Sequence, residues 1–206
     1  SKCPSINLKR LEKRLGIQCI RMPPAVNDFF SANAARLPYY RFPRWFFCSA
    51  CREMREWTNQ DERNLNEGES PVCGKKGRCR TQRLTPMRFV VACEDGHLQD
   101  FPWWRWAHSG RNIAREGRCE NSKLSFETEP RSGLDSLVIK CKSCGSKRDL
   151  GDLMKNPSEA LNFVKCEGRQ PWEPRNSEKT CSKPLRALQR GASNLYYAKI
   201  ISALDI

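Results

Sequence analysis

Cysteine is the residue type with the clearest chemistry in this chain of 206 residues. Twelve cysteines are present, and four of them form two Cys-x-x-Cys pairs, Cys48 with Cys51 and Cys141 with Cys144. Cysteines this close seldom form structural disulfides, whereas their thiolates bind one tetrahedral metal ion with little strain. Cysteine makes up about 6% of the chain, below the roughly 8–10% of a small disulfide scaffold. We therefore expect zinc ligands in a reducing compartment.

The strongest pattern combines Cys48-x2-Cys51 with Cys73-x5-Cys79. Each pair predicts one knuckle with two ligands, and the stretch between the pairs is long enough for both knuckles to meet at one ion. We therefore predict a four-cysteine zinc ribbon. The alternative, buried or redox-active cysteines, is weaker because a thioredoxin-like Cys-x-x-Cys does not need the second pair.

A second candidate site combines the Cys141/Cys144 pair with Cys166 and Cys181. The spacing between the latter two is unusual for a zinc site, and Cys119 is an alternative ligand for one of the four positions. The pattern predicts zinc but leaves the ligand set open.

Cys93 and His97 flank a tight Asp-Gly turn that can present two metal ligands. They either form part of a third zinc site or contribute to the second, and the alternative for His97 is a turn histidine bonded to the backbone. We expect His108 to be an ordinary residue at the end of a helix, and Cys3 and Cys19 to be free thiols. The sequence thus predicts two zinc sites and leaves a third open.

Positive charge is the second prominent feature, because 37 Lys and Arg face 23 Asp and Glu, a formal net charge of +14. Aromatic residues interleaved with cations suit unstacked bases, so DNA, including single strands, is an expected partner. The alternative is that these aromatics fill the core and that the arginines are simply solvated. The residues expected to face phosphates are Lys75, Lys76, Arg78, Arg80 and Arg83 in the Cys73/Cys79 knuckle, with Arg41 and Arg44.

Motifs typical of enzymes are missing from the sequence. The chain has only two histidines, no HExxH, no GxxxxGK[ST] loop and no GxSxG. Because a catalytic zinc keeps an open position and usually has several His or carboxylate ligands, we expect no enzyme. The longest apolar run, Phe89–Cys93, is far shorter than the roughly 18 residues of a membrane span. With no signal-peptide pattern either, we expect a cytoplasmic protein.

Short elements must position these sites, because only 38% of the residues are hydrophobic. We predict an α+β fold, a small irregular domain with zinc-ribbon-like knuckles, short antiparallel strands and short helices. The expected elements are a helix at 7–15 ended by Gly16, strands at 41–47, 87–93 and 195–204, a Trp-rich helix with Asp100 as N-cap, and a hairpin of 124–129 with 134–140. The expected domains are residues 1–40, an N-terminal helix and connection; 41–118, the first ribbon and the Trp-rich helix; and 119–206, a second Cys-rich block with a C-terminal strand.

Four separated motifs cover nearly the whole chain: RFPRWFFC (41–48), PMRFVVACEDGHLQDFPW (86–103), CEGRQPW (166–172) and LRALQRGASNLY (185–196). Together they resemble the DrmB family of the DISARM anti-phage defence system. The resemblance implies a non-catalytic, zinc-containing subunit that pairs with a helicase-like partner, DrmA, and binds DNA with it. Because members of that family are longer, we expect this chain to be a piece of such a protein.

Two hypotheses follow for the function. In the first, the chain is a cytoplasmic zinc-stabilised domain that helps a helicase-like partner hold DNA. In the second, it is a protein-interaction module that docks the helicase and does not bind nucleic acid itself. Strong salt dependence of DNA binding favours the first hypothesis, since contacts with phosphates release counterions.

Overall fold

The computed structural model describes residues 3–23, 39–66, 68–109, 119, 122–155, 157, 159–173, 180–195 and 199–202. The chain divides into two compact units, unit 1 (residues 1–40 and 197–206) and unit 2 (residues 41–196). Short helices and short antiparallel strands make up the regular structure, which confirms the predicted α+β class. Within the described ranges, no helix is both long enough and apolar enough to cross a membrane.

The elements are mostly three to seven residues long. The α-helices are α1 (Lys9–Leu15), α2 (Asn59–Arg63), α3 (Trp103–His108) and α4 (Asp152–Lys155), with 3-10 turns at Gly77–Cys79 and Gly133–Ser136. The strands are β1 (Ser5–Ile6), β2 (Ile20–Arg21), β3 (Trp45–Cys48), β4 (Met54–Glu56), β5 (Leu84–Pro86), β6 (Phe89–Ala92), β7 (Leu98–Asp100), β8 (Leu124–Thr128), β9 (Leu137–Cys141), β10 (Lys147–Asp149) and β11 (Arg186–Gln189).

In unit 1, helix α1 lies beside the β1–β2 pair. The helix ends at Gly16, which adopts the left-handed conformation expected of a glycine that ends a helix. Among the described residues of this unit only Glu12 is buried, and its carboxylate accepts hydrogen bonds from the Lys9 ammonium (3.0 Å) and the Ile20 N–H (3.3 Å). The described part of unit 1 is therefore held by polar bonds rather than by an apolar core.

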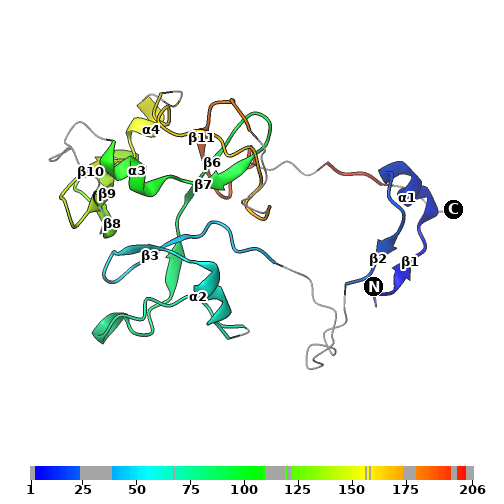
Figure 1. The fold of residues 1–206 in the computed structure, drawn as a ribbon, viewed down its shortest axis with the longest axis horizontal. Helices are drawn as coiled ribbons and strands as arrows, with labels where there is room; N and C mark the ends of the chain where they lie inside the picture. Colours follow the sequence, from blue (N-terminus) through cyan, green and yellow to red (C-terminus); the bar gives the residue numbers. More distant parts are fainter. Residues whose placement is uncertain are drawn as a thin grey trace. The chain divides into compact units, whose positions relative to one another are not determined.

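Unit 2 contains three antiparallel three-stranded sheets, in the orders β4-β3-β5, β11-β6-β7 and β10-β9-β8 (Figure 1). The strands expected at 41–47 and 87–93 are present as the shorter β3 and β6, and the expected hairpin is β8 with β9. The strand expected at 195–204 is absent from residues 195 and 199–202, and its other residues lie outside the described ranges.

The main core of unit 2 is aromatic. Trp103 and Trp106 of α3 are fully buried with Phe101, whose ring centroid lies 4.3 Å and 5.4 Å from theirs. Pro102 directly precedes the helix, and Asp100 is not its N-cap. Asp100 ends β7, and its carboxylate accepts the Arg44 backbone N–H (2.9 Å), so it ties β7 to the segment before β3.

The ribbon formed by β3, β4 and β5 has a much smaller core. Five residues are buried in it, and two of them are cysteines: Phe46, Cys48, Trp57, Cys79 and Leu84. Burial of three apolar side chains provides little free energy for a sheet of this size, so apolar packing alone does not account for the stability of the ribbon.

Arg52 joins the ribbon to the β8–β9–β10 sheet. It follows the Cys48/Cys51 knuckle with a positive φ of 63°, and its guanidinium carbon lies 5.0 Å from the ring centroids of both Phe47 and Phe126. Its Nε donates to the Phe126 carbonyl (2.6 Å), and the Phe126 N–H donates to the Arg52 carbonyl (2.9 Å). These contacts offset the cost of placing a non-glycine residue in the left-handed region.

This arrangement predicts different effects for two substitutions of Arg52. Arg52→Ala removes the hydrogen bond and the ring contacts but keeps the backbone strain, so we expect a loss of about 2 kcal/mol in the free energy of unfolding. Arg52→Gly removes the same contacts but relieves the strain, and the loss should be about 1 kcal/mol smaller. Urea unfolding of both variants measures this difference, and equal losses would contradict the assigned strain.

Candidate metal centres

Ten cysteines and both histidines gather into three clusters of four in unit 2. Within each cluster the ligand atoms all lie within 4.8 Å of one another. The clusters are Cys48, Cys51, Cys73 and Cys79 (cluster 1); Cys93, His97, Cys166 and Cys181 (cluster 2); and His108, Cys119, Cys141 and Cys144 (cluster 3). Each can hold one metal ion with sulfur or sulfur and imidazole donors, the set that zinc prefers.

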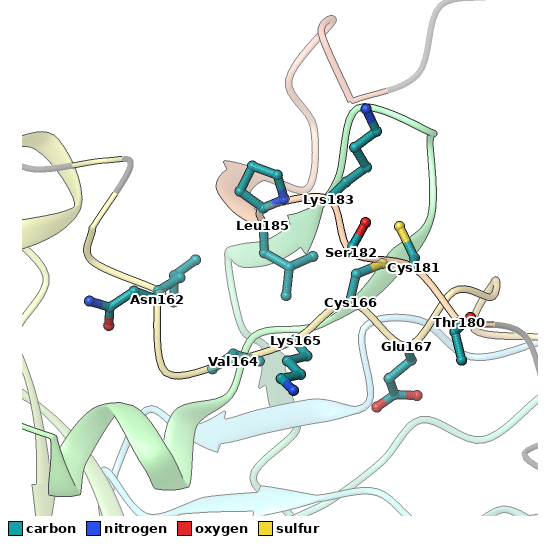
Figure 2. A pocket seen from close by; sticks show the side chains of 12 residues that line it. Asn162, Val164, Lys165, Cys166, Glu167, Thr180, Cys181, Ser182, Lys183 and Leu185 are labelled. Atoms are coloured by element: carbon teal, nitrogen blue, oxygen red, sulfur yellow. The ribbon is translucent and has the colours of Figure 1, made fainter.

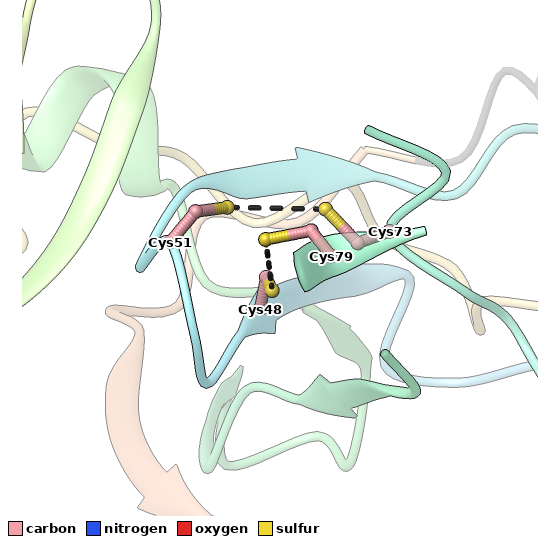
Figure 3. Close-up of side chains that lie close together, drawn as sticks. All are labelled: Cys48, Cys51, Cys73 and Cys79. Carbon is pink, nitrogen blue, oxygen red and sulfur yellow. Dashed lines mark hydrogen bonds between the residues drawn. The ribbon is translucent and has the colours of Figure 1, made fainter. Parts of the chain in front are cut away.

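The sulfur atoms of cluster 1 have the spacing of a tetrahedral site (Figure 3). The Cys48 and Cys79 Sγ atoms are 3.9 Å apart, and those of Cys51 and Cys73 are 3.8 Å apart. Four sulfurs around one ion at the Zn–S distance of about 2.3 Å lie about 3.8 Å from each other. A disulfide would need about 2.05 Å. The geometry of cluster 1 therefore fits a metal ion held by the four predicted ribbon cysteines.

Two knuckles are built in the same way. The N–H of Arg52 donates to the Cys48 carbonyl (2.8 Å), and the N–H of Gly145 donates to the Cys141 carbonyl (2.9 Å). Both residues have positive φ, 63° for Arg52 and 81° for Gly145. Each turn directs its two cysteine side chains to the same side, which explains why Cys-x-x-Cys marks a metal knuckle in both places.

The other half of cluster 1 is a loop held by its own pairing. The Cys73 N–H donates to the Gln82 carbonyl (2.9 Å), and Val72 forms a bridge with Arg83. Because the loop closes on itself, Cys73 and Cys79 face the first knuckle although they are far from it in sequence.

Cluster 2 collects ligands from three segments. The expected tight turn is present between β6 and β7, where the Gly96 N–H donates to the Cys93 carbonyl (3.0 Å) and Gly96 has a φ of 79°. The Cys93 Sγ lies 3.4 Å from His97 Nδ1 and 4.0 Å from the Cys181 Sγ. Sulfur and nitrogen ligands of one zinc ion lie about 3.6 Å apart, so these distances fit a shared ion.

The segment that supplies Cys166 packs against the same turn. The Gln170 side-chain amide donates to the Gly96 carbonyl (2.9 Å), and the Gly168 N–H donates to the Cys166 Sγ (3.4 Å). Cys166 and Cys181 also line a pocket of about 730 Å³, which opens beside the cluster (Figure 2). Cluster 2 is therefore bordered by an open pocket on one side.

Cluster 3 uses a histidine that is prepared to bind through one nitrogen. His108 ends α3, and its Nδ1 lies 2.7 Å from the Trp104 carbonyl, which can only accept a hydrogen bond. The proton therefore sits on Nδ1, and the Nε2 lone pair points to the Cys144 Sγ at 3.3 Å. The Cys119 and Cys141 Sγ atoms are 3.7 Å apart, again the spacing of a tetrahedral site.

The structure groups the cysteines of the second predicted site differently. Cys141 and Cys144 lie in cluster 3, whereas Cys166 and Cys181 lie in cluster 2. The reason is topological: β11 pairs with β6, which brings the segment before it to the Cys93 turn instead of to the second knuckle.

His108 is the candidate ligand that sequence reasoning missed. It lies at a helix end as expected, but beside three cysteines. A count of possible ligands could have identified it. Without Cys3 and Cys19 the chain has ten cysteines, and only both histidines together bring the number of ligands to twelve, enough for three sites of four.

Several thiols of the clusters have shifted pKa values. Burial opposes ionisation of Cys48, but hydrogen bonds from the Cys51 and Ala50 N–H groups outweigh it and lower its pKa to about 7. Burial likewise opposes ionisation of Cys144, yet bonds from Ser146 lower its pKa to about 6. Burial and then the neighbouring sulfurs raise the pKa of the opposing thiols, to about 12 for Cys79, about 11 for Cys119 and about 12 for Cys166. A central cation stabilises all of the thiolates, so binding releases protons.

The basic residues predicted to face phosphates fall into two groups. Arg41, Arg44 and Lys75 are engaged within the fold, Arg41 in two bonds to the Glu62 carboxylate (2.6 and 2.8 Å) and Lys75 with Glu53. Arg44 donates to the Trp57 carbonyl (3.0 Å) and is only 12% exposed in its side chain. Lys76, Arg80 and Arg83 are exposed, and no carboxylate among the described residues pairs with them. Nothing is described of the Arg78 side chain.

The sequence of the chain is similar to that of known proteins over most of its length. Residues 2–197 match the family described as "Domain of unknown function (DUF8724)". The chain belongs to this family. It is also 33% identical to the DISARM protein DrmB of Bacillus paralicheniformis over 188 residues, which are 87% of the chain. The resemblance to DrmB proteins is thus confirmed, and the chain spans 31% of the length of that relative.

The three clusters predict three metal ions per chain, each lost independently. Cys48→Ser should remove the ion of cluster 1, and His108→Ala that of cluster 3, each lowering the metal content by one ion. Since ion binding supplies folding free energy, each loss should cost on the order of several kcal/mol. Elemental analysis and thermal melting measure both effects. Cys19→Ser, an exposed cysteine outside the clusters, is the matched control, and unchanged metal content in His108→Ala would refute its assignment.

The raised pKa of Asp100 predicts that the free energy of unfolding depends on pH. Burial is the largest influence and raises its pKa from 3.8 to about 6, although the Arg44 N–H bond acts in the opposite direction. The folded chain therefore retains this proton longer than the unfolded chain, and stability is lost as pH rises from about 4 through 6. Asp100→Asn keeps the accepting oxygen, so it should be more stable than wild type by roughly 1–2 kcal/mol at pH 7.5. Urea unfolding of both chains between pH 5 and 8 should show this gap shrinking below pH 6; a constant gap would contradict it.

Proposed function

We propose that the three clusters bind structural zinc. The observation that carries this proposal is that each cluster has four sulfur or imidazole donors, so a bound ion has no open position for substrate or water. A catalytic zinc needs such a position. The ions then act as cross-links between short strands, and the chain works without catalysis.

The relationship to DrmB supports a role in anti-phage defence. We propose that the chain is part of a cytoplasmic, non-catalytic subunit of a DISARM-type complex, in which it supports DNA binding by a helicase-like partner of the DrmA type. The relative is named as a DISARM protein, and the chain covers most of its own length in that match.

The charge balance supports DNA as the ligand. The formal net charge is +14, and three zinc ions on ten thiolates still leave about +10. In the loop between Cys73 and Cys79 and just after it, Lys76, Arg80 and Arg83 are exposed. Zinc-held knuckles fix the backbone that carries these cations, so little ordering entropy is lost when they meet phosphates.

One observation favours protein docking as a second function. In unit 1 several apolar side chains are exposed, including Ile17 (43%), Met22 (50%) and Ile200 (91%). Such residues on a unit whose described part has no apolar core suit contact with another protein surface. In this case the chain docks the helicase-like partner and makes no contact with nucleic acid.

Salt dependence separates the two functions. The zinc-loaded chain should bind labelled single-stranded DNA at 50 mM salt and lose at least about 20-fold in affinity by 200 mM, as expected for three or more phosphate contacts. Fluorescence anisotropy at several salt concentrations measures this slope. No binding at low salt, with metal content and fold verified, would refute DNA binding and leave the docking function.

The cations in and just after the loop between Cys73 and Cys79 are tested by a pair of variants. Lys76→Gln with Arg80→Gln should lower DNA affinity about tenfold at 100 mM salt without lowering the melting temperature. Arg41→Gln with Lys155→Gln is the control with the same change in charge, because these side chains already pair with Glu62 and Asp135 and should contribute little. An equal loss in both chains would show that net charge, and not this loop, determines binding.

A further inference from the structure

Two rungs of the β8–β9–β10 sheet place lysine opposite lysine. Lys140 of β9 faces Lys147 of β10. One rung further along, Lys142 follows β9 and Lys123 precedes β8, and the Lys142 N–H donates to the Lys123 carbonyl (2.8 Å). Because Leu124 is the partner of Cys141, this bond extends the same register by one residue. The sheet thus brings together four lysines that the sequence keeps apart.

These lysines share one face of the sheet. Side chains alternate between faces, so Lys140 and Lys142 project to the same side, and their cross-strand partners project with them. Lys123, Lys142 and Lys147 are exposed and Lys140 is half-buried. We call Lys123, Lys140, Lys142 and Lys147 the lysine patch.

The patch is not balanced by neighbouring acids. Lys147 pairs with Glu129 (2.7 Å), but within the described ranges no carboxylate forms an ion pair with the other three ammonium groups. On the next rung of the same face, Val138 is flanked by Glu127 and Asp149, so the acids of this sheet lie away from Lys123 and Lys142. Like charges directly opposite each other destabilise a sheet. An arrangement that costs stability and remains exposed suits a polyanionic partner.

Cluster 3 supports the patch from behind. Lys142 lies in the knuckle between Cys141 and Cys144, and the Cys144 Sγ is 3.3 Å from His108 Nε2. Cys141 lies between Lys140 and Lys142, so its side chain projects to the opposite face of the sheet, which packs on the main core. The lysines therefore lie on the outer face of the sheet.

The first knuckle lies beside the β8 edge of this sheet. Ser125, the partner of Lys140 in β8, forms a bridge with Glu53, which pairs with Lys75. The loop that carries Lys75 therefore also lies near this edge of the sheet.

We propose that the lysine patch is the surface on which this chain holds the phosphate backbone of DNA. The assignment rests on the DNA-binding function proposed above and specifies its contact residues. Cluster 3 acts as the support, because it fixes the knuckle that carries Lys142.

The test is a double variant of the two unpaired lysines that face each other, Lys123→Gln with Lys142→Gln. Removing two phosphate contacts should lower the slope of log affinity against log salt by about 1.4 and weaken binding to an oligothymidine about 20-fold at 100 mM salt. The melting temperature should stay the same or rise, because the like-charge pair is gone. A purely structural role for these lysines predicts the opposite shift in melting.

Two matched variants complete the design. Lys13→Gln with Lys155→Gln changes the net charge equally on exposed lysines outside the patch and should leave the slope nearly unchanged. Lys123→Arg with Lys142→Arg keeps the charge and should restore binding. A loss as large in the first of these as in the patch variant would overturn the assignment. Failure of the unmodified chain to bind DNA would refute both functions, whereas binding that the patch variant leaves intact would refute only this surface.

Discussion

The gathering of ten cysteines and two histidines into three sets of four donors is the constraint on which the rest of unit 2 depends. The strands of this unit have three to five residues, and the ribbon buries only five side chains, two of which are cysteines. Such elements cannot offset the entropy of ordering the chain by apolar burial alone. With zinc bound as proposed, four donors around one ion join them at fixed distances, and the free energy of metal binding becomes folding free energy.

The three clusters also determine which parts of the chain meet. Cluster 2 joins the β6–β7 turn to segments that follow much later, and cluster 3 joins the end of α3 to the second knuckle. Between them lies the Trp103 and Trp106 core, while Arg52 connects the ribbon to β8 through two phenylalanine rings. Residues 41–196 consequently form one compact unit.

The proposed closed metal sites have a consequence for function. With four protein donors, each ion stabilises the backbone but leaves no position for a substrate, so binding is left to the surface. Knuckles are suited to present cations because their tight turns project the intervening side chains outward. Lys142 lies in such a turn and Lys76 in the loop between Cys73 and Cys79, which links the proposed metal sites to the proposed contact with phosphates.

The sequence by itself determined the local features. The Cys-x-x-Cys knuckles, the end of α1 at Gly16, the turn between Cys93 and His97 and the β8–β9 hairpin all depend on neighbouring residues, whose spacing and backbone preferences are visible in one dimension. The short helix α2 was not predicted, although Thr58 and Asp61 form a reciprocal cap, because a polar stretch of five residues has no apolar period to reveal it.

Tertiary structure alone decided the sharing of ligands and the placement of charge. Which cysteines complete a site depends on the pairing of β11 with β6, and the role of His108 depends on α3 ending beside the second knuckle. Tertiary contacts also decide the role of Arg44, whose side chain donates a hydrogen bond to the Trp57 carbonyl. The lysine patch likewise forms only through the register of β8, β9 and β10. These contacts join residues far apart in sequence, and their formation is set by strand pairing and packing that local preferences do not encode.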